Sequence, residues 1–185
     1  PRTVTSNPTG DRCIDRCLPN VYFVHIRKID IMWEGQMKTL ENIGSGTGFL
    51  LDDGRFVTAR HVVEPWMYPS KDDDVNVLLN IIANNGGRVV CHIDAYSPEG
   101  KQLHFTSENA QINRSADKKA ITDSGLYFCL PQRQDLDWAY FYTSEKKGLE
   151  YNNTLSNELL MQTDLTVLGY PLGIGANSAK DIHPI

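Results

Sequence analysis

The stretch GSGTGFLLDDGRFVTARHVVEPW, residues 44–66, carries the clearest strand signals in the chain. Two apolar runs, 46–52 and 55–60, flank Asp53-Gly54, and an Asp-Gly pair between apolar runs is the strongest short signal for a β-hairpin. The glycine-rich start allows close backbone approach within a strand. It leads into a hairpin and not into a helix, so it is not a nucleotide-binding fingerprint. The second run ends at His61, which is either a core histidine or a catalytic base at the rim of a barrel.

Strand signals dominate the rest of the sequence. Further apolar runs lie at 21–29, 31–39, 75–82, 88–96, 101–107, 125–130, 136–143 and 165–171. We expect a bulge or turn at Asp30 and a hairpin across 97–100, while the polar residues 108–121 indicate a loop and 155–162 a short helical turn. Short strands separated by turn signals every 8–12 residues or so predict an all-β barrel or sandwich. A parallel α/β fold is disfavoured because strands and helices do not alternate.

Composition excludes several classes of function. The chain has 185 residues, of which 41% are hydrophobic and 22% charged, which is typical of one globular domain or two small lobes. With a net charge of −5 it lacks the basic footprint of a nucleic-acid or membrane-surface protein, and its apolar runs are too short to span a bilayer. The sequence opens at Pro1 with no methionine and no visible signal peptide, so we expect a processed N-terminus. The cellular compartment stays open.

The four cysteines do not form a metal-binding pattern. Cys13 and Cys17 are four residues apart, and no second pair follows at zinc-ligand spacing. Cys91 and Cys129 lie in strand-like apolar runs, where a buried free thiol is expected. Disulfides would require a compartment outside the cytosol, so the disulfide state is left open. No metal or organic cofactor is predicted.

Three ordered segments resemble the chymotrypsin-like (trypsin-like) peptidase family, especially its bacterial HtrA-type and viral members. Residues 44–63, with Gly44-Ser45-Gly46, Asp53-Gly54, Thr58-Ala59 and His61-Val62-Val63, are similar to the segment that carries the general-base histidine. Asp137-Trp138-Ala139-Tyr140-Phe141 resembles the segment whose aspartate orients that histidine. Residues 167–173, VLGYPLG, are similar to the strand that opens the second barrel in HtrA-type members. Together the resemblance covers about residues 20–175.

The resemblance implies a fold and an activity. The fold would be an antiparallel Greek-key β-barrel of the two-barrel chymotrypsin type, with an N-terminal arm at 1–19 and the first barrel at 20–145. A linker and the start of an incomplete second barrel would occupy 146–185. The activity would be that of a serine endopeptidase acting on a protein or peptide, with no nucleic-acid or membrane partner. His61 would act as general base and then general acid, and Asp137 would orient it.

Two other acids compete with Asp137. Asp94 lies in the strand-like run CHIDAY, and Asp135 would face the same side of the chain as Asp137. Asp137 is preferred because an apolar-Ala-apolar strand follows it directly. The remaining histidines in strand runs, His25, His92 and His104, are expected to be satisfied or exposed. The acidic run at 71–74 indicates a solvated turn more than a calcium site.

The nucleophile is the main departure from the family. Its Gly-x-Ser-Gly-Gly motif follows the second-barrel strand, and no such motif occurs before Ile185. Ser178 follows that strand too closely and lacks the glycine pair that shapes an oxyanion hole. We therefore expect a serine beyond Ile185, supplied by a C-terminal part that could be a separate chain, and an inactive chain without it. Two alternatives stay open: a viral-type protease with a cysteine nucleophile, and an inactive protease-like barrel that binds a peptide or protein at an edge strand.

Overall fold

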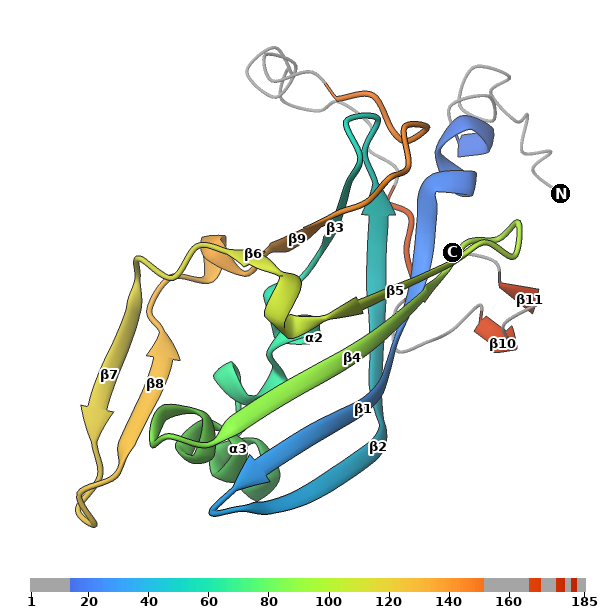
Figure 1. Cartoon of the computed structure of the whole chain (residues 1–185). Helices are drawn as coiled ribbons and strands as arrows, with labels where there is room; N and C mark the ends of the chain where they lie inside the picture. The colour runs from blue at the N-terminus through green and yellow to red at the C-terminus, as the bar shows by residue number, and fades with distance from the viewer. Residues whose placement is uncertain (1–13, 152–166, 171–175, 179–180, 183–185) are drawn as a thin grey trace, which may run out of the picture.

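The computed structural model describes residues 14–151, 167–170, 176–178 and 181–182. Its main strands are β1 (Val21–Trp33), β2 (Gln36–Leu50), β3 (Arg55–Thr58), β4 (Arg88–Tyr96), β5 (Gln102–Thr106), β6 (Gln111–Ile112) and β9 (Ala139–Tyr142). They form one antiparallel sheet in the order β5-β4-β1-β2-β3-β9-β6, which curls into a half-barrel (Figure 1). The expectation of a mainly antiparallel β protein is therefore confirmed, and the sheet has the curvature of a barrel.

The smaller elements surround this sheet. Two further antiparallel pairs are β7 (Asp117–Ile121) with β8 (Tyr127–Pro131), and β10 (Ala176–Ser178) with β11 (Asp181–Ile182). The helices are α2 (Arg60–Val63) and α3 (Asp74–Asn84), with a helical turn at 14–17 and 3-10 turns at Leu18–Asn20, Pro65–Met67, Ser107–Asn109 and Gln134–Leu136. In Figure 1 the β7–β8 pair projects from one side of the sheet, and α3 lies beside the closed end of the β1–β2 hairpin.

Two predicted hairpins are confirmed. Around Asp53-Gly54, the amide of Leu51 donates to the carbonyl of Arg55 at 2.8 Å, and Gly54 has φ +89°, which favours glycine. The turn across 97–100 joins β4 to β5. Both reversals therefore follow from local turn chemistry.

The bulge or turn expected at Asp30 is wrong, because the register shift of β1 lies earlier, between Ile26 and Lys28. β1 continues through Asp30 to Trp33, and the chain reverses at Glu34-Gly35. Both of these residues have positive φ, +49° and +76°, as a two-residue type I′ hairpin loop requires. Glutamate is an uncommon residue in that position, which explains why the sequence pattern did not reveal the turn.

Two glycines of the 44–66 stretch are required for packing. A Cβ atom on Gly46 would lie 2.6 Å from Cγ2 of Val62, and one on Gly48 would lie 2.3 Å from the ring of Phe56. Only glycine allows α2 and the Phe56 ring to approach β2 this closely. The glycine-rich strand therefore helps to place α2, the helical turn that contains His61.

The apolar run at 75–82, expected to be a strand, is instead part of the helix α3. The carboxylate of Asp73 accepts a hydrogen bond from the amide of Asn76 at 3.0 Å and caps the N-terminus of α3. Leu79 and Ile82 are buried on one side of α3, as the helical period of 3.6 residues requires. The acidic run at 71–74 thus supplies a helix cap.

Two other local expectations need correction. Residues 108–121 are not a continuous loop, because they contain β6 and β7. Residues 167–170, predicted as part of a strand, have no regular structure, although Tyr170 is buried against Val21. The helical turn predicted at 155–162 lies outside the described residues.

The side chain of Asn80, on α3, bonds to the backbone of β8 in the way that a neighbouring strand would. Its side-chain amide donates to the carbonyl of Cys129 at 2.6 Å and accepts from the amide of Cys129 at 2.9 Å. It also donates to the carbonyl of Trp66 at 2.8 Å, and the Asn80 residue is fully buried. This one side chain therefore ties β8 and the chain after α2 to the same helix.

Asn80→Ala should lower the free energy of unfolding by about 1–3 kcal/mol, because it leaves buried backbone groups without a hydrogen-bond partner. Urea denaturation measures the loss. Asn85→Ala is the matched control, because the Asn85 side-chain amide makes the same pair of bonds to the backbone of Tyr127, at 2.8 and 2.9 Å. Tyr127 is exposed, so water can take the place of the lost amide. Equal losses for the two variants would contradict this account.

Candidate active site

The end of β3 and the start of β9 bring His61 and Asp137 together. Thr58, the last residue of β3, pairs with Ala139, the first residue of β9, in an antiparallel ladder. In such a ladder the chain leaving one strand and the chain entering the other lie at the same end. His61 and Asp137, 76 residues apart in sequence, therefore meet at this end of the sheet.

Asp137 holds His61 at two points. Its Oδ2 lies 2.7 Å from Nδ1 of the ring, and its Oδ1 accepts a hydrogen bond from the backbone amide of His61 at 2.9 Å. Because an ionised carboxylate can only accept, the proton of the neutral ring is on Nδ1. Nε2 is then an unprotonated base on a half-exposed ring. This arrangement can take up a proton at Nε2 and stabilise the imidazolium that results.

Arg60, the residue before His61, anchors the same helical turn from the interior. Its guanidinium is fully buried and makes a bidentate contact with Asp117, with both bonds at 2.7 Å, and a bond to Glu64 at 3.0 Å. Arg114 closes the network with two bonds to Glu64, at 2.6 and 2.7 Å. Burial would lower the pKa of Arg60, but the hydrogen bonds and charges of its two acidic partners outweigh burial and raise it.

Tyr68 is a further neighbour of the His61 ring, in addition to Asp137. Its ring meets the His61 ring edge to face, with centroids 6.0 Å apart and an interplanar angle of 75°. The Tyr68 hydroxyl is buried, and burial together with the nearby charge of Asp137 raises its pKa to about 12. Neither Tyr68 nor Arg60 was identified by sequence analysis, because an aromatic residue or an arginine after a strand shows no pattern of its own.

The two competing acids lie elsewhere. Asp94 on β4 pairs with Nδ1 of His104 at 2.7 Å, and Asp135 forms an ion pair with Arg133. Neither of them has a contact with His61 among the hydrogen bonds and ion pairs of the described residues. Of the three candidate acids, the structure brings only Asp137 to the ring.

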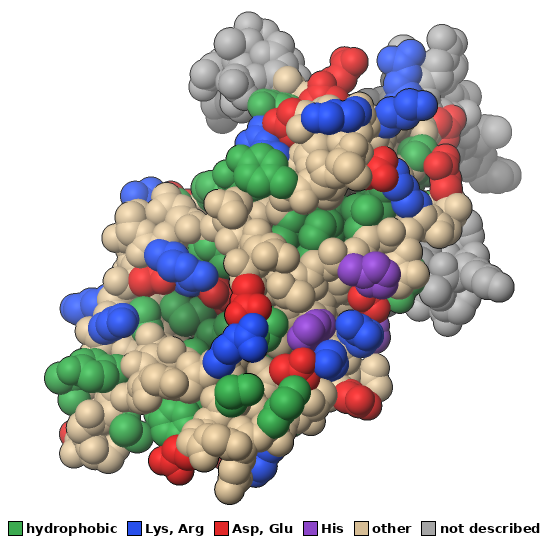
Figure 2. Space-filling model, viewed as in Figure 1, with side chains coloured by type: hydrophobic (Ala, Val, Ile, Leu, Met, Phe, Trp, Pro, Cys, Tyr) green, Lys and Arg blue, Asp and Glu red, His purple; other side chains and the backbone are tan. Residues whose placement is uncertain are grey.

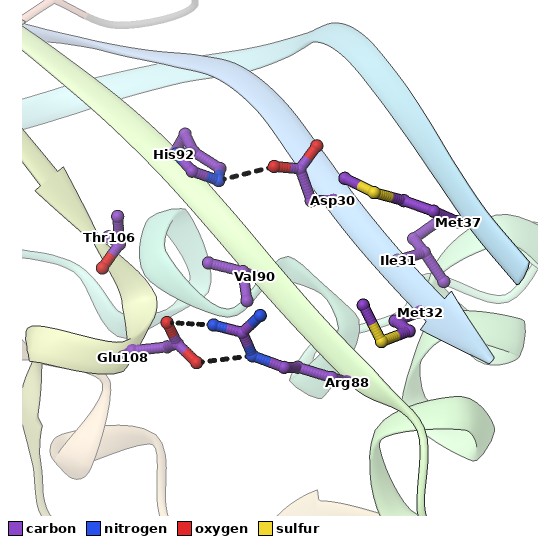
Figure 3. A pocket seen from close by; sticks show the side chains of 9 residues that line it. All are labelled: Asp30, Ile31, Met32, Met37, Arg88, Val90, His92, Thr106 and Glu108. Carbon is purple, nitrogen blue, oxygen red and sulfur yellow. Dashed lines mark hydrogen bonds and ion pairs between the residues drawn. The ribbon is translucent and has the colours of Figure 1, made fainter. Parts of the chain in front are cut away.

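Two other histidines form carboxylate pairs on the outer face of the sheet, where Figure 2 shows histidines beside acidic and basic side chains. Nε2 of His92 contacts Asp30 at 2.9 Å in a shallow cavity of about 160 Å³ (Figure 3). Lys28 and Thr39 also bind Asp30, each at 2.8 Å, and the hydrogen bond from Lys28 is the main cause of its lowered pKa. His92 is thus part of a satisfied surface cluster.

His104 is a closer analogue of His61, because it also uses Nδ1, and its ring is exposed. The surroundings of the two pairs differ. The carboxylate of Asp94 contacts three side chains: His104, Arg27 at 3.5 Å and the Tyr96 hydroxyl at 3.5 Å. Among the three histidine–aspartate pairs of the described ranges, only Asp137 binds both the ring and the backbone amide of its histidine.

No nucleophile is seen beside Nε2 in the part of the chain that the structure describes. Within residues 14–151, no serine or cysteine is hydrogen-bonded to this atom. The predicted free thiols Cys91 and Cys129 are confirmed as buried, and burial raises the pKa of Cys91 to about 12 and also raises that of Cys129. Neither thiol has the character of an activated nucleophile.

The described residues contain no cluster of three or more histidine, cysteine or acidic side chains arranged to hold a metal ion. None of the helices in the described ranges has the length and apolar character needed to cross a bilayer. No protein-family model matches the chain, and no curated protein matches its sequence. Its function is therefore inferred from the positions and chemistry of its own side chains.

Proposed function

We propose that the chain carries the histidine and aspartate of a chymotrypsin-like serine endopeptidase. One observation carries the proposal: a single carboxylate, Asp137, binds both the Nδ1 atom and the backbone amide of His61 at the end of a curled antiparallel sheet. This contact fixes the ring tautomer and the ring orientation together. Both are requirements of a general base in acyl transfer.

In the proposed reaction, a serine hydroxyl attacks the carbonyl carbon of a peptide bond while Nε2 of His61 removes the hydroxyl proton. The imidazolium then gives that proton to the leaving amine, and the acyl–enzyme ester forms. Water repeats the cycle on the ester and releases the acid. Asp137 stays ionised throughout and stabilises the imidazolium. The serine and the donors of the oxyanion hole belong to sequence outside the described residues.

The fold proposed for the complete enzyme is the Greek-key two-barrel type, with the curled sheet as the first barrel. The order of the three resembling segments supports it, as does the position of His61 and Asp137 at one end of paired strands. Tyr170, from the third segment, is buried against Val21 and Phe23 of β1, which is consistent with a chain passing from one barrel to the next.

Labelling with a fluorophosphonate tests the proposal on the full-length protein, together with cleavage of an unfolded protein substrate such as casein. We expect wild-type protein to be labelled on serine and to cleave casein. His61→Ala should slow both reactions by about 10⁴-fold or more, as in other enzymes of this mechanism. His104→Ala, which removes the other Nδ1-bound histidine, should leave both rates unchanged.

Three outcomes would overturn the serine mechanism. The first is labelling of His61→Ala at the wild-type rate. The second is labelling by iodoacetamide that depends on His61 and replaces labelling by the fluorophosphonate, which would identify a cysteine nucleophile. The third is the absence of both labelling and cleavage in wild-type protein, which would favour a binding barrel without catalysis.

A further inference from the structure

The Tyr68 hydroxyl is a buried polar group that makes no hydrogen bond of standard geometry among the described residues, although the Asp137 carboxylate is near enough to act on it as a hydrogen-bond partner. Most buried side-chain polar atoms in folded proteins have a partner, so an unsatisfied hydroxyl calls for a physical explanation. The backbone of Tyr68 is held by a hydrogen bond from its amide to the carbonyl of Pro65 at 3.0 Å, and the Tyr68 ring packs edge to face with the His61 ring. The hydroxyl therefore lies close to the His61–Asp137 pair.

The carboxylate of Asp137 is the acceptor nearest in effect to this hydroxyl, because it raises the pKa of Tyr68 both through its charge and as a hydrogen-bond partner. Each of its oxygens has one partner, the Nδ1 atom or the backbone amide of His61, whereas a carboxylate offers about four lone-pair sites. The charge of Asp137 acts directly on the Tyr68 hydroxyl, and a phenol with a pKa of about 12 keeps its proton at neutral pH. Tyr68 is thus a permanent donor beside an acid with unused acceptor sites.

The charges of Arg60 and Asp117 act on the same hydroxyl in opposite directions. It therefore lies between the His61–Asp137 pair and the buried ion network that anchors α2. A group at this position can hold the carboxylate in place while the ring gains and loses its proton.

We propose that Tyr68 is a positioning residue, whose hydroxyl donates a hydrogen bond to Asp137 and keeps that carboxylate aligned with Nδ1 of His61. Its role in turnover rests on the peptidase function proposed above, but its contact with Asp137 does not. In this proposal the Tyr68 hydroxyl acts on the reaction through the acid.

The test is Tyr68→Phe, which removes the hydroxyl and keeps the ring. Proton NMR of the Nδ1–H of His61 gives a readout that needs no enzymatic activity. Hydrogen bonds to charged groups are strong enough that their loss corresponds to a ten- to hundredfold change in an equilibrium or rate. We expect solvent exchange of this proton to be about ten- to hundredfold faster in the variant, since the freed carboxylate leaves Nδ1 more often.

Tyr96→Phe is the matched control, because the Tyr96 hydroxyl lies 3.5 Å from Asp94, the acid that binds His104. It should leave the His61 proton unchanged. In the active full-length protein, Tyr68→Phe should lower kcat by a similar factor with KM unchanged. An Nδ1–H exchange rate equal to that of wild type, or an equal effect of Tyr96→Phe, would overturn the proposal. If wild-type protein shows no peptidase activity, the endopeptidase proposal fails, and the exchange measurement still decides the role of Tyr68.

Discussion

Arg60→Met should lower the free energy of unfolding by about 3–5 kcal/mol, the loss expected when one member of a buried ion pair is removed. The substitution leaves the buried carboxylate of Glu64 and the mostly buried carboxylate of Asp117 without the guanidinium that neutralised both. Arg114 still contacts Glu64, but no contact of the described residues replaces the lost partner of Asp117. Urea denaturation at neutral pH, followed by circular dichroism, measures the loss.

Arg133→Met is the matched control for this prediction. Arg133 also forms a bidentate pair with an aspartate, Asp135, but both side chains are largely exposed. Water solvates such a pair once it is broken, so no measurable change in stability is expected. If Arg60→Met and Arg133→Met behaved alike, the buried network would not have the structural role assigned to it.

A double variant separates lost charge balance from lost volume. Arg60→Met combined with Asp117→Leu removes both charges of the bidentate pair and fills the space with apolar atoms. Replacing a buried pair in this way is often neutral, so the double variant should be more stable than Arg60→Met alone. A double variant less stable than the single one would show that packing, and not an uncompensated charge, causes the loss.

Local signals predicted the hairpins and the strands near the site. The Asp53-Gly54 turn and the strand that follows Asp137 could be read from the sequence because turn chemistry and apolar patterning act over a few residues. The choice of Asp137 over Asp94 also depended on the strand directly after it. The pairing of β3 with β9, which brings His61 to Asp137, is a long-range contact that no local pattern contains.

The features that the sequence did not reveal depend on tertiary contacts. The 75–82 run has the β-branched residues of a strand, and only the cap by Asp73 and the burial of Leu79 and Ile82 make it a helix. Arg60 resembles a surface residue at the end of a strand. Its burial depends on Asp117, 57 residues later, in a segment expected to be a loop. Charged partners at such separations cannot be paired from composition or periodicity.

Asp137→Asn should lower kcat of the full-length protein by about 10⁴-fold if the proposed endopeptidase function is correct, the typical cost of losing this carboxylate. The asparagine can keep the geometry, because its Oδ1 still accepts from the backbone amide of His61. Its amide nitrogen, however, is a donor and would face Nδ1. Nδ1 must then accept, so the ring proton moves to Nε2, and His61 can no longer remove a proton from a nucleophile.

Nitrogen NMR of the histidine rings separates this cause from unfolding. In Asp137→Asn we expect His61 to change from the Nδ1–H to the Nε2–H tautomer while the other histidine signals stay in place. Asp94→Asn is the internal control: it should change the tautomer of His104 in the same way and leave both His61 and kcat unaltered. A large fall in kcat with the tautomer of His61 preserved would mean that Asp137 acts through its charge alone. Loss of activity in Asp94→Asn would instead identify His104 and Asp94, on β5 and β4, as the catalytic pair. Both His61 and His104 are solvent-accessible imidazoles that an aspartate holds at Nδ1, and only the imidazole beside the nucleophile can transfer its proton.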